Sequence, residues 1–420
     1  MTRLRLFLNA SQVVTCVGPA RARRGAEQGD AGVRDGVGVA VGADGRVLAV
    51  APDAELRSTH PGAEVIDCEQ GVLTPGFVDS HTHAIFGRAR YEEQELRAAG
   101  VGYLEIARRG GGIHSSVRDL RARSADDLAA LAAARLRRLA AHGTTTVEVK
   151  SGYGLSLEAE RTTLRVIRRL AGELPIRLVP TFLGAHEVPL EYREAPRTRD
   201  EYIACVTEEM IPAVAAEGLA RFCDVFCEPG VYTVSETRRI LGAARAAGLA
   251  LKLHADELEN GAAAELAAEL GATSADHLAA ISAQGITALA AAGTVATLLP
   301  GTMLFLGRPK QAPARALVEA GVPVALASDF NPGTSPTVNF PLVLTLGVSQ
   351  LRLSVGEAFV AATVNGAAAL GLADRLGQLA PGFEADLALF DVCDHREIPY
   401  WYGDHRCRRT WVSGRPAHQG

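Results

Sequence analysis

The chain has 420 residues, a formal net charge of -5 at pH 7 and 48% apolar residues. This length suits a barrel of roughly 250 residues together with a second, smaller unit. The apolar fraction excludes a disordered chain, and the weak net charge argues against nucleic acid or an anionic membrane as a partner. We therefore expect a globular α/β enzyme that acts on a small molecule.

Targeting and redox features are sparse. The N-terminal run MTRLRLFLNASQ is less apolar than a signal-peptide core of roughly 7 to 15 residues, and no stretch reaches the about 18 apolar residues of a membrane span. We expect a cytoplasmic protein.

The seven cysteines contain no C-x-x-C pair, which indicates reduced structural thiols. Cys223 and Cys227 lie four residues apart, but on a buried strand such cysteines are more often small core residues than metal ligands.

Both ends of the chain show β patterns. RLFLNASQVV, GVGVAVGADGRVLAVAP, DLALFDV and RRTWVSGRP indicate antiparallel strands and hairpins. We predict that residues 1–73 and 373–420 together form one small β-sandwich domain. The polar stretch 19–35 is predicted to be a surface loop.

Residues 74–372 alternate between short apolar runs and longer amphipathic segments. In residues 125–143, for example, apolar residues recur every three or four positions and a glycine follows the last turn, as in a helix. Strands that alternate with helices form parallel sheets, and eight strands close into a (β/α)8 barrel of the TIM type. The expected strands are residues 76–81, 145–150, 176–182, 221–227, 249–254, 273–278, 294–299 and 322–329.

The strongest local signal is the segment PGFVDSHTHAIFG, in which His81 and His83 end the first expected strand. Side chains two residues apart on a strand point the same way, so both imidazoles can share one metal ion. A His-x-His pair alone is weak evidence, because such pairs also occur on solvated strands. Its position at the C-terminal end of a barrel strand, where barrel enzymes carry their active sites, favours a functional role.

Other polar residues interrupt apolar strands at the same end of the predicted barrel. His254 ends the fifth strand, His277 lies in the sixth and Asp329 ends the eighth. One such residue would more often be a hydrogen-bonded core or capping residue, but several on one rim indicate a site. We predict that His81, His83, His254 and Asp329 hold one ion, Zn or Fe, with a position left for water.

A bound ion of this kind lowers the pKa of water from about 15.7 to about 7 and so supplies a hydroxide nucleophile. We expect Asp329 to accept the proton of the water, with Glu257 as a second carboxylate and His277 polarising the attacked carbonyl group. The alternative for Glu257 is a carboxylate that stabilises the N-terminus of the following helix.

Further residues are candidates for binding the substrate. The segment KSGYGLS suits a tight loop that presents a tyrosine. In DFNPGTSP, the residues after the predicted ligand Asp329 must lie near the bound water. An arginine suits a carboxylate because its planar fork donates two hydrogen bonds. Both loops could also be ordinary turns between strand and helix, and an exposed arginine could simply be solvated. The candidates are Arg90, Tyr153, His186, Asn331, Gly333 and Thr334, with Glu257 as a further contact.

These residues resemble the imidazolonepropionase family of the amidohydrolase superfamily. The resemblance is carried by PGFVDSHTH, GGGI, VEVKSGYG, TFLGAHEVP, CDVFCE, LHADELENG, SADHL, LLPG, SDFNPGTSPT, LGQLAPGFEADLALFD and PYWYG. It implies the four ligands and the substrate contacts named above, a homodimer, and hydrolysis of 4-imidazolone-5-propanoate to N-formimidoyl-L-glutamate. SGYG, LGAH and NPG together distinguish this family from related deaminases.

The sequence departs from the family pattern in small ways. Glu257 stands where glutamine is common, which weakens a general-base role for it, and Thr334 stands where serine is also common. Relatives with two metal ions use a carbamylated lysine on the fourth strand, whereas Lys150 ends the second expected strand and Glu228 follows the fourth. The resemblance therefore implies one divalent or trivalent ion per subunit.

Two other functions stay open at the level of sequence. The same chemistry could deaminate a purine, pyrimidine or similar ring, and a substrate without a carboxylate would then not depend on Arg90. A non-catalytic metal-binding or scaffold protein could also keep the fold, because fold alone does not imply function. Bound metal without turnover would favour that alternative.

Overall fold

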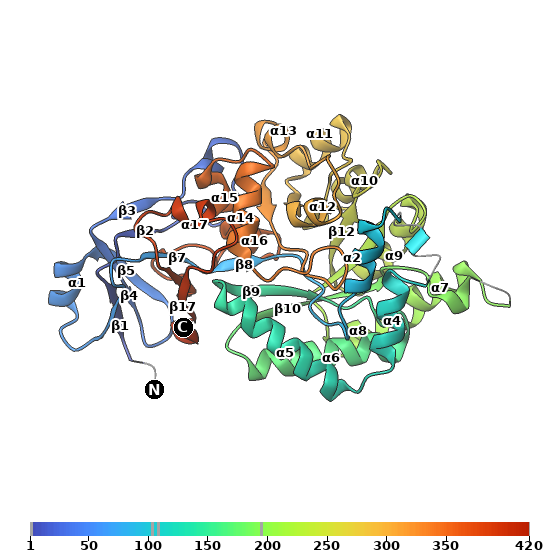
Figure 1. Ribbon diagram of the computed structural model, residues 1–420, viewed down its shortest axis with the longest axis horizontal. Helices are drawn as coiled ribbons and strands as arrows, with labels where there is room; N and C mark the ends of the chain where they lie inside the picture. Colours follow the sequence, from blue (N-terminus) through green and yellow to red (C-terminus); the bar gives the residue numbers. More distant parts are fainter. Residues whose placement is uncertain (1–2, 102–104, 107–109, 194–195, 420) are drawn as a thin grey trace.

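The computed structural model describes residues 3–101, 105–106, 110–193 and 196–419. Figure 1 shows a β-rich part that carries both chain ends beside a larger part in which helices surround a sheet. None of the described helices is both long enough and apolar enough to cross a membrane.

The larger part is the predicted barrel. Its eight-stranded sheet runs in chain order from β8 to β15, and all seven neighbouring pairs are parallel. Each strand overlaps an expected run, so this prediction is confirmed. The strands are β8 Phe77–Asp79, β9 Thr144–Lys150, β10 Arg177–Ala185, β11 Phe222–Cys227, β12 Ala250–Ala255, β13 Ser274–His277, β14 Val295–Leu298 and β15 Val324–Leu326.

The barrel closes just beyond the ends of its first and last strands. Thr82 and Phe330 form a parallel bridge, the His83 N–H donates to the Phe330 carbonyl at 2.8 Å, and the Asp329 N–H donates to the His81 carbonyl at 3.1 Å. β15 is shorter than expected at both ends. Beyond Leu326 the Ser328 N–H donates to the Asp79 side chain at 2.9 Å, and Asp329 has a left-handed conformation with φ 51°. The closure is therefore made by the segments that carry three of the four predicted metal ligands.

The helices bury apolar stripes against the barrel. In α5, Ser124 and Asp127 form a capping box, and Gly143 follows the helix with φ 93°. On the barrel strands, Cys223 and Cys227 are buried core residues, as expected. The helices around the barrel are α2 Tyr91–Ala98, α4 Ile113–Arg121, α5 Ala125–Ala141, α6 Leu157–Glu173, α7 Arg199–Ala204, α8 Ile211–Ala216, α9 Val234–Ala246, α10 Ala263–Glu269, α11 Ala283–Ala292, α12 Pro300–Phe305, α13 Ala314–Glu319, α14 Phe340–Ser349, α15 Val355–Ala362 and α16 Val364–Ala368.

The β-rich part is a sandwich of two sheets built from both chain ends, as predicted. Its core lies between the sheets, where the Phe7 and Trp411 rings meet edge to face at 4.9 Å. One sheet has the order β5-β4-β1-β6, with β5 Val47–Pro52, β4 Val37–Val41, β1 Arg5–Leu8 and β6 Glu64–Asp67. The other has the order β18-β17-β16-β7-β2-β3, with β18 Arg415–Gln419, β17 Cys407–Val412, β16 Leu387–Phe390, β7 Val72–Pro75, β2 Gln12–Val14 and β3 Val33–Asp35.

Not all pairs in the sandwich are antiparallel. β1 pairs in parallel with β6, and β2 pairs in parallel with β7. The helix α1, Asp53–Thr59, connects β5 to β6, so the chain returns across the first sheet in the direction of β5. A parallel return of this kind requires such a crossover connection, which the hairpin signals in the sequence do not reveal.

The interpretation of residues 19–35 as a surface loop is wrong in part. The segment contains a short 3-10 helix, Gly25–Gly29, and the strand β3. Gln28 is fully buried, donates to the Val324 carbonyl at 3.2 Å and accepts from the Val324 N–H at 3.1 Å. Asn365 joins them, because its amide nitrogen donates to the same carbonyl at 2.8 Å and its oxygen accepts from the Arg23 N–H at 2.7 Å. The segment thus binds the first residue of β15.

We predict that Asn365→Ala lowers the free energy of unfolding by about 3 kcal/mol, because it removes the Asn365 partner of the buried Arg23 N–H and carbonyl groups and one of the two donors to the Val324 carbonyl. Urea unfolding measures the loss. The control is Gln350→Ala, which removes an exposed amide and should change stability by about 0.5 kcal/mol or less. Equal stability of the two variants would contradict this role of Asn365.

Candidate metal centre

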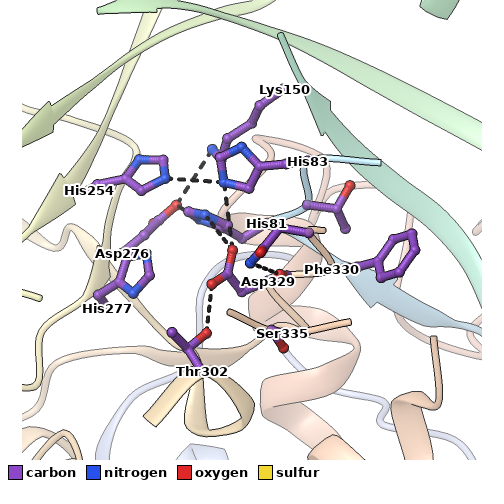
Figure 2. A network of polar contacts seen from close by, with 12 residues as sticks. His81, His83, Lys150, His254, Asp276, His277, Thr302, Asp329, Phe330 and Ser335 are labelled. Carbon is purple, nitrogen blue, oxygen red and sulfur yellow. Dashed lines mark hydrogen bonds and ion pairs between the residues drawn. The ribbon is translucent and has the colours of Figure 1, made fainter. Parts of the chain in front are cut away.

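The four predicted ligands converge at the C-terminal end of the barrel (Figure 2). Asp329 Oδ1 lies 3.6 Å from His81 Nε2 and 3.6 Å from His83 Nε2. His83 Nε2 lies 3.3 Å from His254 Nε2. All four side chains are buried. Asp329 Oδ1 therefore lies close to two imidazole nitrogens, and the His254 nitrogen lies beside one of these two.

This donor set fits a transition metal ion. Ligand atoms about 2.0 to 2.1 Å from a tetrahedral ion are about 3.3 Å apart, which is close to the separations above. His81 Nε2 is buried and has no hydrogen-bond partner among the described residues. His81, His83 and Asp329 together form a group whose ligand atoms could hold one ion, and His254 could share one with His81 and His277.

Burial sets the protonation states of these ligands. It lowers the pKa of His81 and of His83 well below the ordinary value, and the neighbouring histidines and Lys150 lower both further. Both imidazoles are thus held in the neutral form, which is the form that binds metals. Burial raises the pKa of Asp329 to about 6, although a hydrogen bond from the Thr302 hydroxyl to Oδ2 at 2.6 Å opposes the rise.

His277 and Glu257 lie beside the ligands. The His277 ring is centred 5.2 Å from the His81 ring and 5.2 Å from the His254 ring, and its Nε2 is 3.6 Å from Glu257 Oε2. Burial raises the pKa of Glu257 well above its ordinary value, and Asp329 raises it further. A buried carboxyl group with an increased affinity for a proton is therefore placed next to an imidazole at the site.

The structure disfavours the alternative reading of Glu257 as a helix N-terminal carboxylate. Its side chain faces His277, and α10 begins only at Ala263. Instead Glu228 binds this loop: its two oxygens accept the backbone N–H groups of Glu257, Leu258 and Glu259 at 2.8 to 3.1 Å. Glu228 thus fixes the loop that carries Glu257.

Aromatic rings form one wall of the site. The His186 ring stacks on His83 at 5.0 Å, and the Tyr153 ring lies 5.3 Å from His186 and 5.9 Å from His83. His186 Nδ1 is 3.0 Å from the Gly152 carbonyl oxygen, and burial lowers the His186 pKa to about 3. The site therefore offers a neutral aromatic surface beside the ligands, with His83, His186 and His254 as a further group able to hold an ion.

A buried carboxylate that the sequence did not single out shapes the SGYG loop. Glu160 of α6 is fully buried and accepts the N–H groups of Gly152, Gly154 and Leu155 at 2.8 to 3.2 Å. Gly152 has φ 100°, a conformation that L side chains rarely adopt. These contacts hold the loop in the form that places Tyr153 beside His186.

The loop after Asp329 is braced by Asn331. Its Oδ1 accepts the N–H groups of Gly333 at 2.9 Å and Thr334 at 2.7 Å. Its Nδ2 donates to the Asp329 carbonyl at 2.7 Å and to the Thr334 hydroxyl at 2.8 Å. The hydrogen bonds that the structure gives this amide are thus all within the loop, so Asn331 supports the shape of the loop.

Arg90 lies against that loop. A Cβ added to Gly333 would lie 1.7 Å from Arg90 Nη2, so only glycine leaves room for the guanidinium group. Arg90 is 6% exposed, and its Nη1 is buried without a hydrogen-bond partner among the described residues. Glu93 lies 3.5 Å from Arg90 Nε and 3.8 Å from Arg97 Nη1. Arg90 and Arg97 thus share one carboxylate, and the buried Nη1 of Arg90 suits an anionic group of a ligand.

Carboxylates behind the histidines also escaped the sequence interpretation. Asp276 Oδ2 lies 2.7 Å from His81 Nδ1, and Asp224 Oδ2 lies 3.0 Å from His254 Nδ1. The signal was present, because a charged residue interrupts each apolar strand in CDVF and SADH. Such pairs fix the orientation and tautomer of a ligand histidine.

We predict that the chain binds one ion of Zn²⁺ or Fe²⁺, and that metal added after chelation raises the thermal midpoint, because the ion binds the folded state only. Elemental analysis and calorimetry measure both effects. His254→Ala should abolish them. His405→Ala should not, because His405 is an exposed histidine whose Nε2 lies 2.9 Å from the carbonyl oxygen of Ala141, far along the chain. Equal metal content in the two variants would contradict the assignment.

Comparisons with known proteins identify the family of the chain. The model of the amidohydrolase family matches residues 102–418. An imidazolonepropionase of Symbiobacterium thermophilum is 50% identical over 402 residues, which cover 95% of this chain and 93% of that protein. That of Solibacter usitatus is 44% identical over 420 residues and 98% of each chain.

Solved structures share the fold. A zinc-bound adenosine deaminase from Xanthomonas campestris has a TM-score of 0.73 and 20% identity, covering 98% of this chain and 92% of that one. E. coli guanine deaminase has a TM-score of 0.70 and 18% identity, covering 99% of each chain. At these identities the likeness shows the fold alone, whereas the identity to the bacterial relatives shows the family. The chain belongs to the amidohydrolase family and, within it, to the imidazolonepropionases.

Proposed function

We propose that this chain hydrolyses 4-imidazolone-5-propanoate to N-formimidoyl-L-glutamate by cleaving the lactam bond between the ring carbonyl carbon and nitrogen. The observation that carries the proposal is Arg90, whose buried Nη1 lacks a hydrogen-bond partner among the described residues. Its charge is close enough to His186 to lower the pKa of that ring, after the larger effects of burial and His254. A carboxylate bound to Arg90 would thus lie at the edge of the histidine-lined site.

The proposed cofactor is one Zn or Fe ion held by His81, His83, His254 and Asp329. When bound, such an ion supplies a water whose pKa falls from about 15.7 to about 7, so that it can attack an amide carbon at neutral pH. The support for this ligand set is the 3.3 to 3.6 Å spacing of its donor atoms and their burial.

The chain's own residues bind the substrate and move protons. Arg90 binds the propanoate group through charge-assisted hydrogen bonds, and the His186 and Tyr153 rings flank the planar imidazolone. His277 donates a hydrogen bond to the carbonyl oxygen as negative charge develops on it. This carbonyl becomes the α-carboxylate of the product.

Asp329 and Glu257 are the proposed proton carriers. A proton released by the attacking water passes to a carboxylate and then to the leaving ring nitrogen. Burial raises the pKa of both groups, Asp329 to about 6 and Glu257 well above its ordinary value. Both carboxylates are therefore stronger proton acceptors than a solvated carboxylate.

The test of the reaction is turnover of 4-imidazolone-5-propanoate by metal-loaded protein. We expect loss of the substrate's ultraviolet absorbance and formation of N-formimidoyl-L-glutamate, identified by mass spectrometry. The same protein after chelation, and the His254→Ala variant, should form none. Fully metal-loaded, folded protein that leaves the substrate unchanged would refute the proposed function.

The role of Arg90 predicts a change in KM. Arg90→Ala removes the charge-assisted hydrogen bonds of a buried guanidinium, about 1.5 to 3 kcal/mol, and should raise KM roughly 10- to 100-fold with a smaller effect on kcat. Gly333→Ala should act in the same direction, because the added Cβ occupies the position of the Arg90 guanidinium. Steady-state kinetics measures both variants.

The matched control is Arg88→Ala, two residues away, where the arginine is exposed and paired with Glu92 at 2.6 Å. Its kinetic constants should stay close to those of the unchanged protein. If Arg90→Ala leaves KM unaltered, the carboxylate is bound elsewhere. A deaminase that acts on a neutral ring would likewise not depend on Arg90.

A further inference from the structure

Five charged side chains lie inside the barrel beneath the metal centre. All five are 0% exposed, and they project inward because side chains two residues apart on a strand share a face. We call them the buried charge cluster: Glu148, Lys150, Asp224, Lys252 and Asp276. Charges so deeply buried are tolerated only with close partners of opposite sign, and the cluster supplies them.

Two carboxylates of the cluster, Asp224 and Asp276, contact a ligand histidine. Of the ion pairs between these two carboxylates and the lysines, that of Lys150 with Asp224 is the shortest. Lys150 Nζ lies 2.7 Å from Asp224 Oδ2 and 2.8 Å from Glu148 Oε2. Asp224 holds His254 at two points: Oδ2 is 3.0 Å from the ring Nδ1, and Oδ1 accepts the backbone N–H at 3.1 Å. A chain of direct contacts thus runs from Lys150 through Asp224 to His254.

These contacts select one form of His254. His254 Nδ1 lies 3.0 Å from the Asp224 carboxylate but outside hydrogen-bond geometry, and this charge contact favours a proton on Nδ1. The lone pair of the neutral ring is then on Nε2, the atom 3.3 Å from His83 Nε2. Among the described residues, the ion-pair contacts of Lys150 are with carboxylates, so apart from its charge Lys150 reaches the ligand histidines through Asp224 and Asp276. The Lys150 contact with Asp276, at 3.8 Å, is much longer than that with Asp224.

We propose that Lys150 is a positioning residue of the metal centre, which holds Asp224 in the place where it orients His254 toward the ion. The inference rests on the proposed ligand set and adds to it a residue that touches neither the ion nor the substrate. Figure 2 draws Lys150 in the same view as the ligand histidines.

The sign of the effect on metal affinity separates this role from simple electrostatics. Loss of a buried ammonium group leaves more negative charge near the site, which by Coulomb attraction alone would make a cation bind more tightly. Loss of the support for Asp224 has the opposite result, because a misoriented histidine binds the ion less well. A weaker affinity therefore identifies positioning.

The experiment compares Lys150→Met with the unchanged full-length protein by Zn²⁺ competition against a chelator and by the absorption spectrum of the Co²⁺-substituted site. We expect about 10- to 100-fold weaker Zn²⁺ binding, the usual cost of losing a residue that supports a ligand, and an altered Co²⁺ spectrum. Lys150→Gln, which keeps an N–H donor for Asp224, should recover part of the affinity.

Lys252→Met is the matched control. Lys252 is equally buried and carries the same charge, but it contacts Glu148 at 3.3 Å, Asp276 at 3.5 Å and the Ser80 carbonyl at 2.8 Å. In an Asp224→Asn background, Lys150→Met should have little additional effect, because it acts through Asp224. Lys252→Met should add its full effect in that background.

Three results would overturn the inference: Zn²⁺ affinity of Lys150→Met that is unchanged or tighter, an unaltered Co²⁺ spectrum, or additive effects of Lys150→Met and Asp224→Asn. If circular dichroism shows that Lys150→Met does not fold, Lys150→Gln replaces it, and an affinity within twofold of the unchanged protein overturns the inference. Failure of the unchanged protein to bind Zn²⁺ would instead refute the proposed metal centre itself.

Discussion

The closure of the barrel between β8 and β15 is the constraint on which the site depends. Two backbone hydrogen bonds, from Asp329 to the His81 carbonyl and from His83 to the Phe330 carbonyl, join the first and last strands at their C-terminal ends. They fix the carboxylate relative to the two histidines before any ion is present. Asp329 also has a left-handed conformation, which turns the chain from the barrel wall into the loop that contains Asn331 and Gly333. Closure of the barrel therefore positions three of the four candidate ligands relative to one another.

The barrel and the candidate ligands could be predicted because each depends on local pattern. Eight apolar runs separated by amphipathic segments specify the strands, and a histidine or aspartate at the end of a run faces the rim whatever the neighbouring strands are. The sandwich followed from hairpin signals at both ends. The parallel pairs of the sandwich could not be predicted from hairpin signals. β1 and β6 are far apart in the sequence, and whether they run parallel depends on the crossover helix between β5 and β6.

The supporting residues were not predicted, for the same physical reason. Asp276 and Asp224 are visible as charges within apolar strands, but which histidine each one meets depends on the register between neighbouring strands. Glu160 and Glu228 are ordinary glutamates in the sequence, and only the folded loops bring backbone N–H groups to them. The polar composition of residues 19–35 likewise suggested a solvent-exposed loop, although the Gln28 side chain accepts the backbone N–H of Val324 in β15. Long-range contacts give such residues their role, and composition does not show it.

The contact between Gln28 and Val324 also limits how the chain can be divided. β15 begins at Val324, and its first backbone groups are bonded to a side chain from the N-terminal region and to Asn365 of α16. A fragment that starts at residue 74 would contain every candidate ligand but would lack Gln28. The backbone groups of Val324, at the start of β15, would then lose their Gln28 partner. The sandwich and the barrel are thus separate in architecture but are joined by these hydrogen bonds. An engineered minimal catalyst would therefore have to include residues 19–35 as well as the barrel.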